Sequence, residues 1–351
     1  MKATICFFKL HVQNYLSTKL HVMAHHSLPR KTLGHFPTPV TELDRLSRYL
    51  NGPRLLMKRD DLTGLAMGGN KTRKLEFLMA DALSGNCDTV VTAGAIQSNH
   101  CRQTAAAAAA CGLDCHLVLG GSRPQQAAGN YLLDQLLGAQ IHFAGDFRKG
   151  ETVPEVVEEL KSRGYKPYVI PYGGSNELGA AAFSEALKEL DTQLADVDAH
   201  VDHIIFASSS GATQAGLIVG KKVLGRDFEI TGIEIDKNES DDRTFAERVS
   251  ELTEQTAEFL GVQGGFSGSD VDSRSDYLGG GYGVVGDPER QAITLTARHE
   301  GILLDPVYSG RAMGGLIEMI SRGQFTRDET VLFWHTGGTP ALFAYADELV
   351  S

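Results

Sequence analysis

The chain has 351 residues, of which 42% are hydrophobic and 22% are charged, a composition typical of a soluble globular protein with room for two domains. Its net charge of −11, from 33 basic and 44 acidic residues, disfavours nucleic acid and anionic membranes as main partners. No segment offers the roughly 18 consecutive apolar residues of a membrane-spanning helix, so we expect a soluble protein.

The N-terminal segment differs from the rest of the chain in charge. From Met1 to Thr41 there is no Asp or Glu, and the charged residues are all basic. An organellar transit peptide is also basic, but it is richer in arginine and serine than this segment. We therefore expect residues 1–32 to be a disordered or wrongly assigned extension, with the folded protein beginning near Leu33.

Short apolar runs alternate with helical patterns along the remaining chain. The predicted strands are 54–58, 89–92, 116–119, 140–143, 168–170, 203–207, 229–235 and 330–335. The predicted helices are 72–83, 99–111, 127–137, 154–163, 177–190, 212–224, 241–260, 288–299 and 310–321. Buried parallel strands between helices produce this alternation, so the predicted fold class is α/β.

Two compositional features fall within this alternation. The alanine run 105–110 lies in a predicted helix, and its small side chains indicate close packing against a sheet. The glycine-rich stretch 261–283 is either a mobile active-site loop or an irregular connector.

The five cysteines are odd in number and include no Cys-x-x-Cys pair and no histidine spacing typical of zinc. They are Cys6, Cys87, Cys101, Cys111 and Cys115. This pattern indicates reduced thiols, a cytoplasmic location and no metal site. Cys101 is interpreted as a small buried thiol on a helix.

Lys71 follows two glycines and an asparagine at the start of a predicted helix. A lysine nucleophile is activated by a lowered pKa, and we expect the helix dipole and the adjacent Arg73 and Lys74 to favour the neutral amine. The alternative is a solvated surface lysine, because the spacing rules for lysine nucleophiles are loose.

The predicted strand 203–207 leads through small and hydroxyl residues into the helix that begins at Ala212. The connecting run is Ser208-Ser209-Ser210-Gly211-Ala212-Thr213. Small residues let backbone N–H groups approach an anion, and the helix N-terminus favours negative charge, so the run predicts a phosphate site. It lacks the Gly-Lys-Ser/Thr of a nucleotide P-loop and the Gly-x-Gly-x-x-Gly of a dinucleotide site. A serine-capped helix without a ligand is the alternative.

A second junction between strand and helix carries Ser98, Asn99 and His100. By default Ser98 and Asn99 cap the helix and His100 is a partly exposed first-turn residue. With a phosphate site on the same sheet, this helix start becomes a candidate site for the carboxylate of a small amphoteric substrate.

Two tyrosines and one threonine complete the candidate residues. Tyr282 lies between two glycines, and Tyr308 precedes a helix, so each is either a site residue or a structural anchor. Thr336 follows the strand 330–335 and is expected at the carboxyl edge of the sheet, where ligands collect.

Taken together, these segments resemble the pyridoxal-phosphate enzymes of fold type II, in the group that holds D-cysteine desulfhydrase, 1-aminocyclopropane-1-carboxylate deaminase and L-cysteate sulfo-lyase. The similarity runs from about Leu33 to Tyr345. The runs that carry it, in family order, are Lys58-Arg59-Asp60-Asp61, Gly68-Gly69-Asn70-Lys71, Gln97-Ser98-Asn99-His100, Pro171-Tyr172-Gly173-Gly174-Ser175-Asn176, Asp305-Pro306-Val307-Tyr308 and His335-Thr336-Gly337-Gly338.

The resemblance implies that Lys71 holds pyridoxal 5′-phosphate as an internal aldimine and then moves the substrate Cα proton. It also implies that Asn99 contacts the ring hydroxyl, while Ser98, with adjacent donors of Asn99 and His100, holds the substrate carboxylate. The phosphate loop of the family matches Ser209, Ser210, Gly211, Ala212 and Thr213, with Ser209 and Ala212 where glycines are common.

The remaining matches concern the cofactor ring and the substrate. Thr336 matches the group that faces the pyridine nitrogen, and a hydroxyl there favours elimination because it stabilises a protonated ring less than an aspartate does. Tyr282 and Tyr308 match the paired aromatic residues beside the substrate, and at least one of them acts as an acid or base or stacks on the substrate.

Within this group the sequence favours α,β-elimination of D-cysteine to pyruvate, hydrogen sulfide and ammonia. Deaminases that open a cyclopropane ring typically carry Tyr-Glu where this chain has Tyr308-Ser309. The runs 66–69, 92–96 and 309–313 are similar to D-cysteine desulfhydrases more than to sulfo-lyases. L-Cysteate sulfo-lyase and 1-aminocyclopropane-1-carboxylate deaminase remain alternatives, and a non-catalytic pyridoxal-phosphate-binding protein is the alternative from a different class.

The resemblance also implies a domain organisation. It predicts two open, mainly parallel sheets, with a large cofactor-binding domain of residues 33–73 and 185–351 and a small inserted domain of residues 74–184. Family members are commonly dimers, so a homodimer that acts on a small amino acid is expected.

Overall fold

The computed structural model describes residues 28–196, 199–236 and 243–350. Its strands are β1 (Val40–Glu42), β2 (Arg54–Arg59), β3 (Thr89–Ala95), β4 (Asp114–Gly120), β5 (Gln140–Phe143), β6 (Pro167–Val169), β7 (His203–Ser208), β8 (Glu229–Glu234), β9 (Asp272–Arg274) and β10 (Thr330–His335). Its α-helices are α2 (Asp44–Leu50), α3 (Lys71–Ser84), α4 (Asn99–Cys111), α5 (Gly129–Leu136), α6 (Val153–Ser162), α7 (Glu177–Asp196), α8 (Ala212–Leu224), α9 (Phe245–Phe259), α10 (Asp287–Glu300), α11 (Ser309–Ser321) and α12 (Ala346–Val350).

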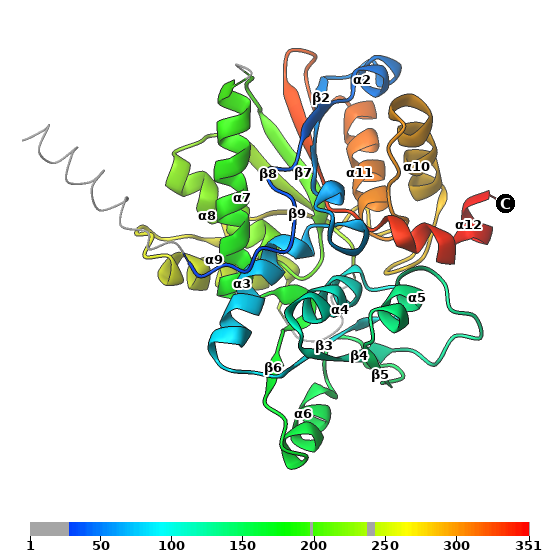
Figure 1. Cartoon of the computed structure of the whole chain (residues 1–351). Coiled ribbons are helices and arrows are strands. Elements are labelled where there is room, and N and C mark those ends of the chain that lie inside the picture. Colours follow the sequence, from blue (N-terminus) through cyan, green and yellow to red (C-terminus); the bar gives the residue numbers. More distant parts are fainter. Residues whose placement is uncertain (1–27, 197–198, 237–242, 351) are drawn as a thin grey trace, which may run out of the picture.

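The described strands form two separate sheets (Figure 1). The larger has six strands in the order β1-β2-β10-β7-β8-β9, and all its pairs are parallel except β1 with β2. The smaller has four parallel strands in the order β5-β4-β3-β6. The prediction of an α/β fold with two mainly parallel sheets is therefore confirmed.

Helices cover both faces of each sheet, which explains why the central strands are apolar along their whole length. In Figure 1, α7, α8 and α9 lie on one side of the six-stranded sheet, and α2, α10 and α11 lie on the other. The smaller sheet packs on α3, α4 and α5 through one face and on α6 through the other. The predicted alanine-rich helix is α4, and Ala105, Ala107 and Ala108 are buried against this sheet as expected.

The predicted strands are all present, but two short strands and two short helices were missed. β1 and β9 are edge strands of three residues, and α2 and α12 span seven and five residues, which is too short for a clear periodic pattern. The predicted helix 241–260 begins instead at Phe245, and residues 241–242 lie outside the described residues. A capping box sets this start, because Thr244 Oγ1 accepts the Glu247 N–H and Glu247 Oε2 accepts the Thr244 N–H.

The segment just before the first strand contacts the body of the protein. Within the predicted extension 1–32, residues 1–27 lie outside the described residues. Arg30 forms an ion pair with Glu76 of α3, and the Lys31 N–H donates to the Glu76 carbonyl at 2.8 Å. The strands of the smaller sheet all fall between residues 89 and 169, while the domain boundaries at 74 and 184 stay a prediction.

A buried ionic network joins β2, α3 and α7 beneath the six-stranded sheet. Arg73 Nη2 donates to Asp60 Oδ1 at 2.8 Å and to Glu189 Oε1 at 2.9 Å, and Lys58 Nζ donates to the same Glu189 oxygen at 2.6 Å. Trp334 of β10 joins the network, because its Nε1–H donates to Asp60 Oδ2 at 2.8 Å. Each charged group of this network thus has a partner of opposite charge, as the burial of charge requires.

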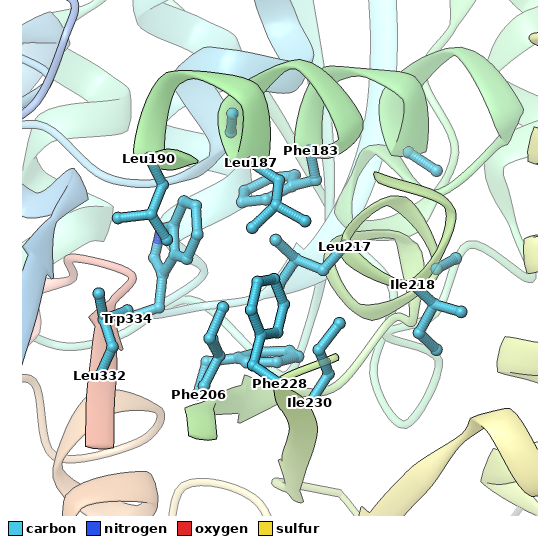
Figure 2. Packing of buried hydrophobic residues seen from close by; sticks show 14 of the residues in the cluster. Phe183, Leu187, Leu190, Phe206, Leu217, Ile218, Phe228, Ile230, Leu332 and Trp334 are labelled. Atoms are coloured by element: carbon cyan, nitrogen blue, oxygen red, sulfur yellow. The ribbon is translucent and has the colours of Figure 1, made fainter. Parts of the chain in front are cut away.

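The main apolar core lies between the six-stranded sheet and helices α7 and α8 (Figure 2). Phe183 of α7 is fully buried and its ring lies 5.8 Å from that of Trp334. We expect Phe183→Ala to lower the free energy of unfolding by about 3–5 kcal/mol, because the cavity left there cannot collapse. Denaturant unfolding followed by circular dichroism measures this loss, and Phe343→Ala, at a side chain 69% exposed, should change it by less than about 0.5 kcal/mol.

The ionic network also predicts a dependence of stability on pH. Burial alone would raise the pKa of Glu189, but hydrogen bonds and charges of Arg73 and Lys58 hold that pKa at about 2, below the ordinary 4.5. A lowered carboxyl pKa stabilises the fold above pH 4.5, and this contribution is lost as the pH falls towards 2. Glu189→Gln should therefore cost about 3 kcal/mol at neutral pH and flatten the decline in stability between these two values.

Unfolding midpoints measured across the acid range check this expectation. Glu185→Gln is the matched control, because Glu185 lies on the same helix in an exposed pair with Lys188 and should shift the midpoint little. An unchanged acid limb in Glu189→Gln would contradict the role of the network.

Candidate active site

A cavity opens where the carboxyl ends of β7 and β10 face the starts of α3, α4 and α8. Its lining residues are Asn70, Lys71, Asn99, His100, Ala207, Ser208, Ser209, Ser210, Gly211, Thr213, Tyr308 and Thr336. Ligands collect at this edge of parallel sheets because strand ends and helix N-termini converge there. Most of the predicted site residues thus line one cavity. Ser98, Ala212 and Tyr282 do not line it, but Ser98 and Ala212 are next to lining residues in the chain and Tyr282 bonds to Tyr308.

Lys71 is the first residue of α3, and the preceding backbone fixes its place. The Asn70 N–H donates to the Thr336 carbonyl at 2.9 Å, which joins the start of α3 to the residue after β10. Gly68 and Gly69 have φ values of +71° and +133°, and a Cβ on Gly68 would lie 2.0 Å from the Asp61 carbonyl oxygen. Only glycine fits this approach, so the two glycines before the lysine are a steric requirement.

The electrostatics of Lys71 differ from the sequence prediction in their cause. Burial lowers the pKa of Lys71 to about 8, while a hydrogen bond with Lys74 acts in the opposite direction and raises it. Arg73 does not act on the amine as expected, because its guanidinium is paired with Asp60 and Glu189. The pKa of Lys71 is thus lowered, as the sequence predicts, but desolvation rather than neighbouring cations lowers it.

Lys74 is a second buried amine beside the first. Its side chain is 1% exposed, and its Nζ donates to the Gly173 carbonyl at 3.1 Å. Burial first, and then the charge of Lys71, lower its pKa well below the ordinary value. Lys71 and Lys74 are therefore neighbouring buried amines, and burial lowers the pKa of both.

The start of α4 holds its three candidate side chains in defined orientations. Ser98 is the N-cap, and its Oγ accepts the Cys101 N–H at 3.2 Å. Asn99 Oδ1 accepts a hydrogen bond from Asn130 Nδ2 at 2.8 Å, so the Asn99 NH₂ group is the end left for the cavity. Asn130 is fully buried and also donates to the Gln97 carbonyl at 2.9 Å, which fixes the amide that orients Asn99.

His100 is buried rather than partly exposed, contrary to the default interpretation. The Thr92 hydroxyl donates to the Ile170 carbonyl at 2.8 Å, so the 2.9 Å contact with His100 makes Thr92 Oγ1 the acceptor and His100 Nε2 the donor. Burial lowers the pKa of His100 well below its ordinary value. The neutral ring therefore presents an unprotonated Nδ1, which has no partner within the described structure.

The loop from β7 to α8 has the properties of an anion site. Gly211 has φ +91° and is the N-cap of α8, and the first turn of this helix carries no acidic residue. Ser210 Oγ accepts a hydrogen bond from Ser175 Oγ at 2.7 Å, and Thr213 Oγ1 accepts one from Asn70 Nδ2 at 3.3 Å. The cavity lining includes no Asp or Glu, so the donor set fits a phosphate group.

The two tyrosines meet at the far side of the cavity. The Tyr282 and Tyr308 hydroxyl oxygens are 2.7 Å apart, and the rings cross at 79° with centroids 5.8 Å apart. Burial is the main cause that raises both pKa values well above the ordinary one, so both hydroxyls keep their protons at neutral pH. Tyr308 lines the cavity, and Tyr282 reaches it through this hydrogen bond.

Some residues at the site were not found from the sequence. Asn70 was named only as part of the run before Lys71, although it lines the cavity and binds Thr213. Tyr172 was likewise named only within the run 171–176, and Asn130 gave no local signal because its role arises from contacts with distant segments. Burial raises the pKa of Tyr172 to about 12, and its hydroxyl bonds to Ser209.

The described residues offer neither a metal-binding cluster nor a membrane-spanning helix. No group of three His, Cys, Asp or Glu side chains there is arranged to hold a metal ion. None of the helices there is long and apolar enough to cross a membrane.

Comparison with known proteins gives concordant matches. A family model described as pyridoxal-phosphate dependent enzyme matches residues 31–337. D-cysteine desulfhydrase of Salmonella choleraesuis (strain SC-B67) is 43% identical over 323 residues, covering 90% of this chain and 96% of the relative. D-cysteine desulfhydrase of Klebsiella pneumoniae (strain 342) is 42% identical over 327 residues, covering 92% and 97%. A crystal structure described as an ACC deaminase homologue has a TM-score of 0.84 at 38% identity, covering 94% of this chain and 97% of that one.

The cavity fits the cofactor that the family model names. It offers a lysine amine of lowered pKa for an aldehyde, and a helix N-terminus with hydroxyl groups for a phosphate. Family, fold class and cofactor are thus as the sequence predicted. The chain belongs to the pyridoxal-phosphate-dependent enzymes.

Proposed function

We propose that this enzyme is a lyase that converts D-cysteine and water to pyruvate, hydrogen sulfide and ammonia. The observation that carries the proposal is that one cavity joins the Lys71 amine, the N-terminus of α8 and the Tyr308 hydroxyl. Elimination with this cofactor requires a covalent anchor, a phosphate site and a proton donor. The names of the relatives with 42% and 43% identity give independent support.

The cofactor would be held by groups that already converge on the cavity. Lys71 would bind the aldehyde, Asn99 would donate to the ring hydroxyl, and Thr336 would face the pyridine nitrogen. The phosphate would be held by Ser209, Ser210, Gly211, Ala212 and Thr213. The fixed orientation of the Asn99 amide supports its role as a donor. Replacing Asn130 by Asp should weaken binding of the cofactor to the apoprotein, and unchanged affinity would contradict this assignment.

When bound, the cofactor withdraws electrons from the substrate Cα and makes its C–H bond acidic. The Lys71 amine would take this proton, since burial lowers its pKa to about 8 and leaves part of it unprotonated near neutral pH. Lys74 would assist, because a second amine of lowered pKa within hydrogen-bond reach can share the added proton. The absence of any carboxylate from the cavity lining keeps both amines unpaired with acids.

The tyrosine pair would supply the proton for the leaving sulfur. Tyr308 lines the cavity and keeps its proton because burial raises its pKa. Tyr282 lies 2.7 Å from it and can return a proton through the shared hydrogen bond. The substrate carboxylate would lie at the start of α4, held by Ser98 and Asn99 and by the main-chain N–H of His100, since the neutral His100 Nδ1 is an acceptor.

The residue after Tyr308 favours elimination over opening of a cyclopropane ring. Ser309 is fully buried, and its hydroxyl donates to Asp305 Oδ1 at 2.7 Å. No carboxylate is therefore available beside Tyr308 at this position. L-Cysteate sulfo-lyase and 1-aminocyclopropane-1-carboxylate deaminase stay as alternatives, and the latter has the support of the similar crystal structure.

We further propose a cytoplasmic homodimer. A reducing compartment agrees with the four cysteines of the described residues, which are all free. The dimer rests on the resemblance to fold type II enzymes. A molar mass in solution equal to the 37.9 kDa of one chain would contradict it.

We expect the purified, cofactor-supplied protein to show a visible absorption band that borohydride abolishes. Lys71→Ala should lack this band and should lose activity by about a thousandfold, because it removes both the covalent anchor and the base. Lys161→Ala is the matched control, since Lys161 is an exposed lysine on α6 and should leave band and activity unchanged. A protein without the band, or full turnover in Lys71→Ala, would contradict the catalytic proposal.

The products from three substrates then decide among the activities. D-Cysteine should yield sulfide and pyruvate, while L-cysteate and the cyclopropane amino acid should yield little sulfite or 2-oxobutanoate. Sulfite from L-cysteate without sulfide from D-cysteine would favour the sulfo-lyase, and 2-oxobutanoate alone would favour the deaminase. A visible band with no product from any of the three would favour a non-catalytic binding protein.

A further inference from the structure

Arg148 connects the two sheets at the edge of the active site. It lies in the connection between β5 and α6, and its Nη2 donates to Asp236 Oδ1 at 2.8 Å and to Oδ2 at 2.9 Å. Asp236 follows β8 in the other sheet, so this ion pair joins the four-stranded sheet to the six-stranded sheet. The two side chains are 21% and 10% exposed, which leaves the pair little screened by solvent.

The backbone of Arg148 is itself fixed against its own sheet. Gly120 ends β4, and a Cβ on Gly120 would lie 2.3 Å from the Arg148 Cβ. The arginine therefore projects from a position that cannot move independently of β4. Lys149 adds a weaker contact, with its Nζ 3.5 Å from Asp236 Oδ2.

The same guanidinium packs on one of the active-site tyrosines. Arg148 Cζ lies 4.5 Å from the centroid of the Tyr282 ring, within the range of a cation–π contact. The Tyr282 hydroxyl meets the Tyr308 hydroxyl at 2.7 Å, and Tyr308 lines the cavity. A continuous line of contacts thus runs from Asp236 through Arg148 and Tyr282 to the site of chemistry.

The backbone around Tyr282 is held separately by a second arginine. Arg311 is buried and donates to the Gly281 carbonyl at 2.8 Å and to the Val284 carbonyl at 2.7 Å, and its charge is paired with Glu289. These bonds fix the loop but do not fix the rotation of the Tyr282 ring. The face of that ring rests on Arg148, so the orientation of the hydroxyl depends on this contact.

We propose that Arg148 is a positioning residue, which holds the Tyr282–Tyr308 pair in place through its ion pair with Asp236. The proposal rests on the proposed function, in which Tyr308 protonates the leaving group. Arg148 does not line the cavity, so it acts through the tyrosines and not on the substrate. Its loss should lower kcat and leave KM nearly unchanged, since the substrate carboxylate binds at α4.

The test compares Arg148→Met with a second arginine that also pairs with an acid and lies against a tyrosine ring. Arg163 lies 5.4 Å from the centroid of the Tyr165 ring and pairs with Glu159 at 3.4 Å. It is the C-cap residue of α6. We expect Arg148→Met to lower kcat roughly tenfold to a hundredfold, the loss typical of a misplaced catalytic group. Arg163→Met should match the unsubstituted enzyme.

Two further variants separate the ion pair from the ring contact. Asp236→Asn removes the charge that orients Arg148, so this single substitution should lower kcat. In the double variant with Arg148→Met it should cause no further fall in kcat, because both substitutions act on one interaction. Arg148→Lys keeps the charge without the planar guanidinium and should recover only part of kcat. It also serves as the folded variant if Arg148→Met proves unstable.

A readout without the cofactor separates this proposal from the proposed function. In the apoprotein, Arg148→Met and Arg148→Lys should raise hydrogen exchange in residues 277–286 and change the near-ultraviolet circular dichroism of the tyrosines, whereas Arg163→Met should do neither in that segment. If the protein lacks the visible band, the proposed function fails, but these measurements still test whether Arg148 positions Tyr282. Exchange and kcat equal to those of the control, or a rise in KM at constant kcat, would overturn the positioning role.

Discussion

The active site depends on one backbone hydrogen bond between segments far apart in the sequence. The Asn70 N–H donates to the Thr336 carbonyl at 2.9 Å and joins the first turn of α3 to the end of β10. A Cβ on Gly337 would lie 2.6 Å from the Gly69 Cα, so the two chains approach closely enough to exclude any side chain. This contact places the Lys71 amine at the same edge of the six-stranded sheet as the N-terminus of α8. The distance between the Lys71 amine and the N-terminus of α8 is therefore set by the six-stranded sheet and not by flexible loops.

Electrostatic isolation of the amine follows from the same architecture. Arg73 is two residues after Lys71, yet its charge is balanced by Asp60 and Glu189 on the opposite side of α3. Lys71 instead lines the cavity, whose lining includes no acid, while Lys74 is buried with its Nζ on the Gly173 carbonyl. One helix thus separates a neutralised structural arginine from two amines whose pKa values burial lowers.

The features predicted from sequence are those coded within a few residues. The structure shows several features that a local sequence pattern predicts. They are the starts of helices at Asn99 and Ala212, the glycines before Lys71 and the threonine after β10. Other features depend on packing that no local pattern predicts. They are the cause of the lowered pKa of Lys71, the burial of His100 and the short edge strands. Asn130 orients Asn99 from 31 residues away, and its own surroundings in the sequence do not distinguish it from a surface asparagine.

The contacts that a local pattern cannot predict are also those that join the two sheets. The cavity lining comes from both sheets, contrary to the expectation that the two helix starts share one sheet. Asn99 follows β3 of the four-stranded sheet, whereas Gly211 and Thr336 follow β7 and β10 of the six-stranded sheet. The tyrosine pair also joins the two sheets, because Tyr308 starts from the six-stranded side while the face of Tyr282 rests on Arg148 from the four-stranded side. In the proposed function, cofactor binding and proton delivery to the leaving group therefore both depend on how the two sheets are placed relative to each other.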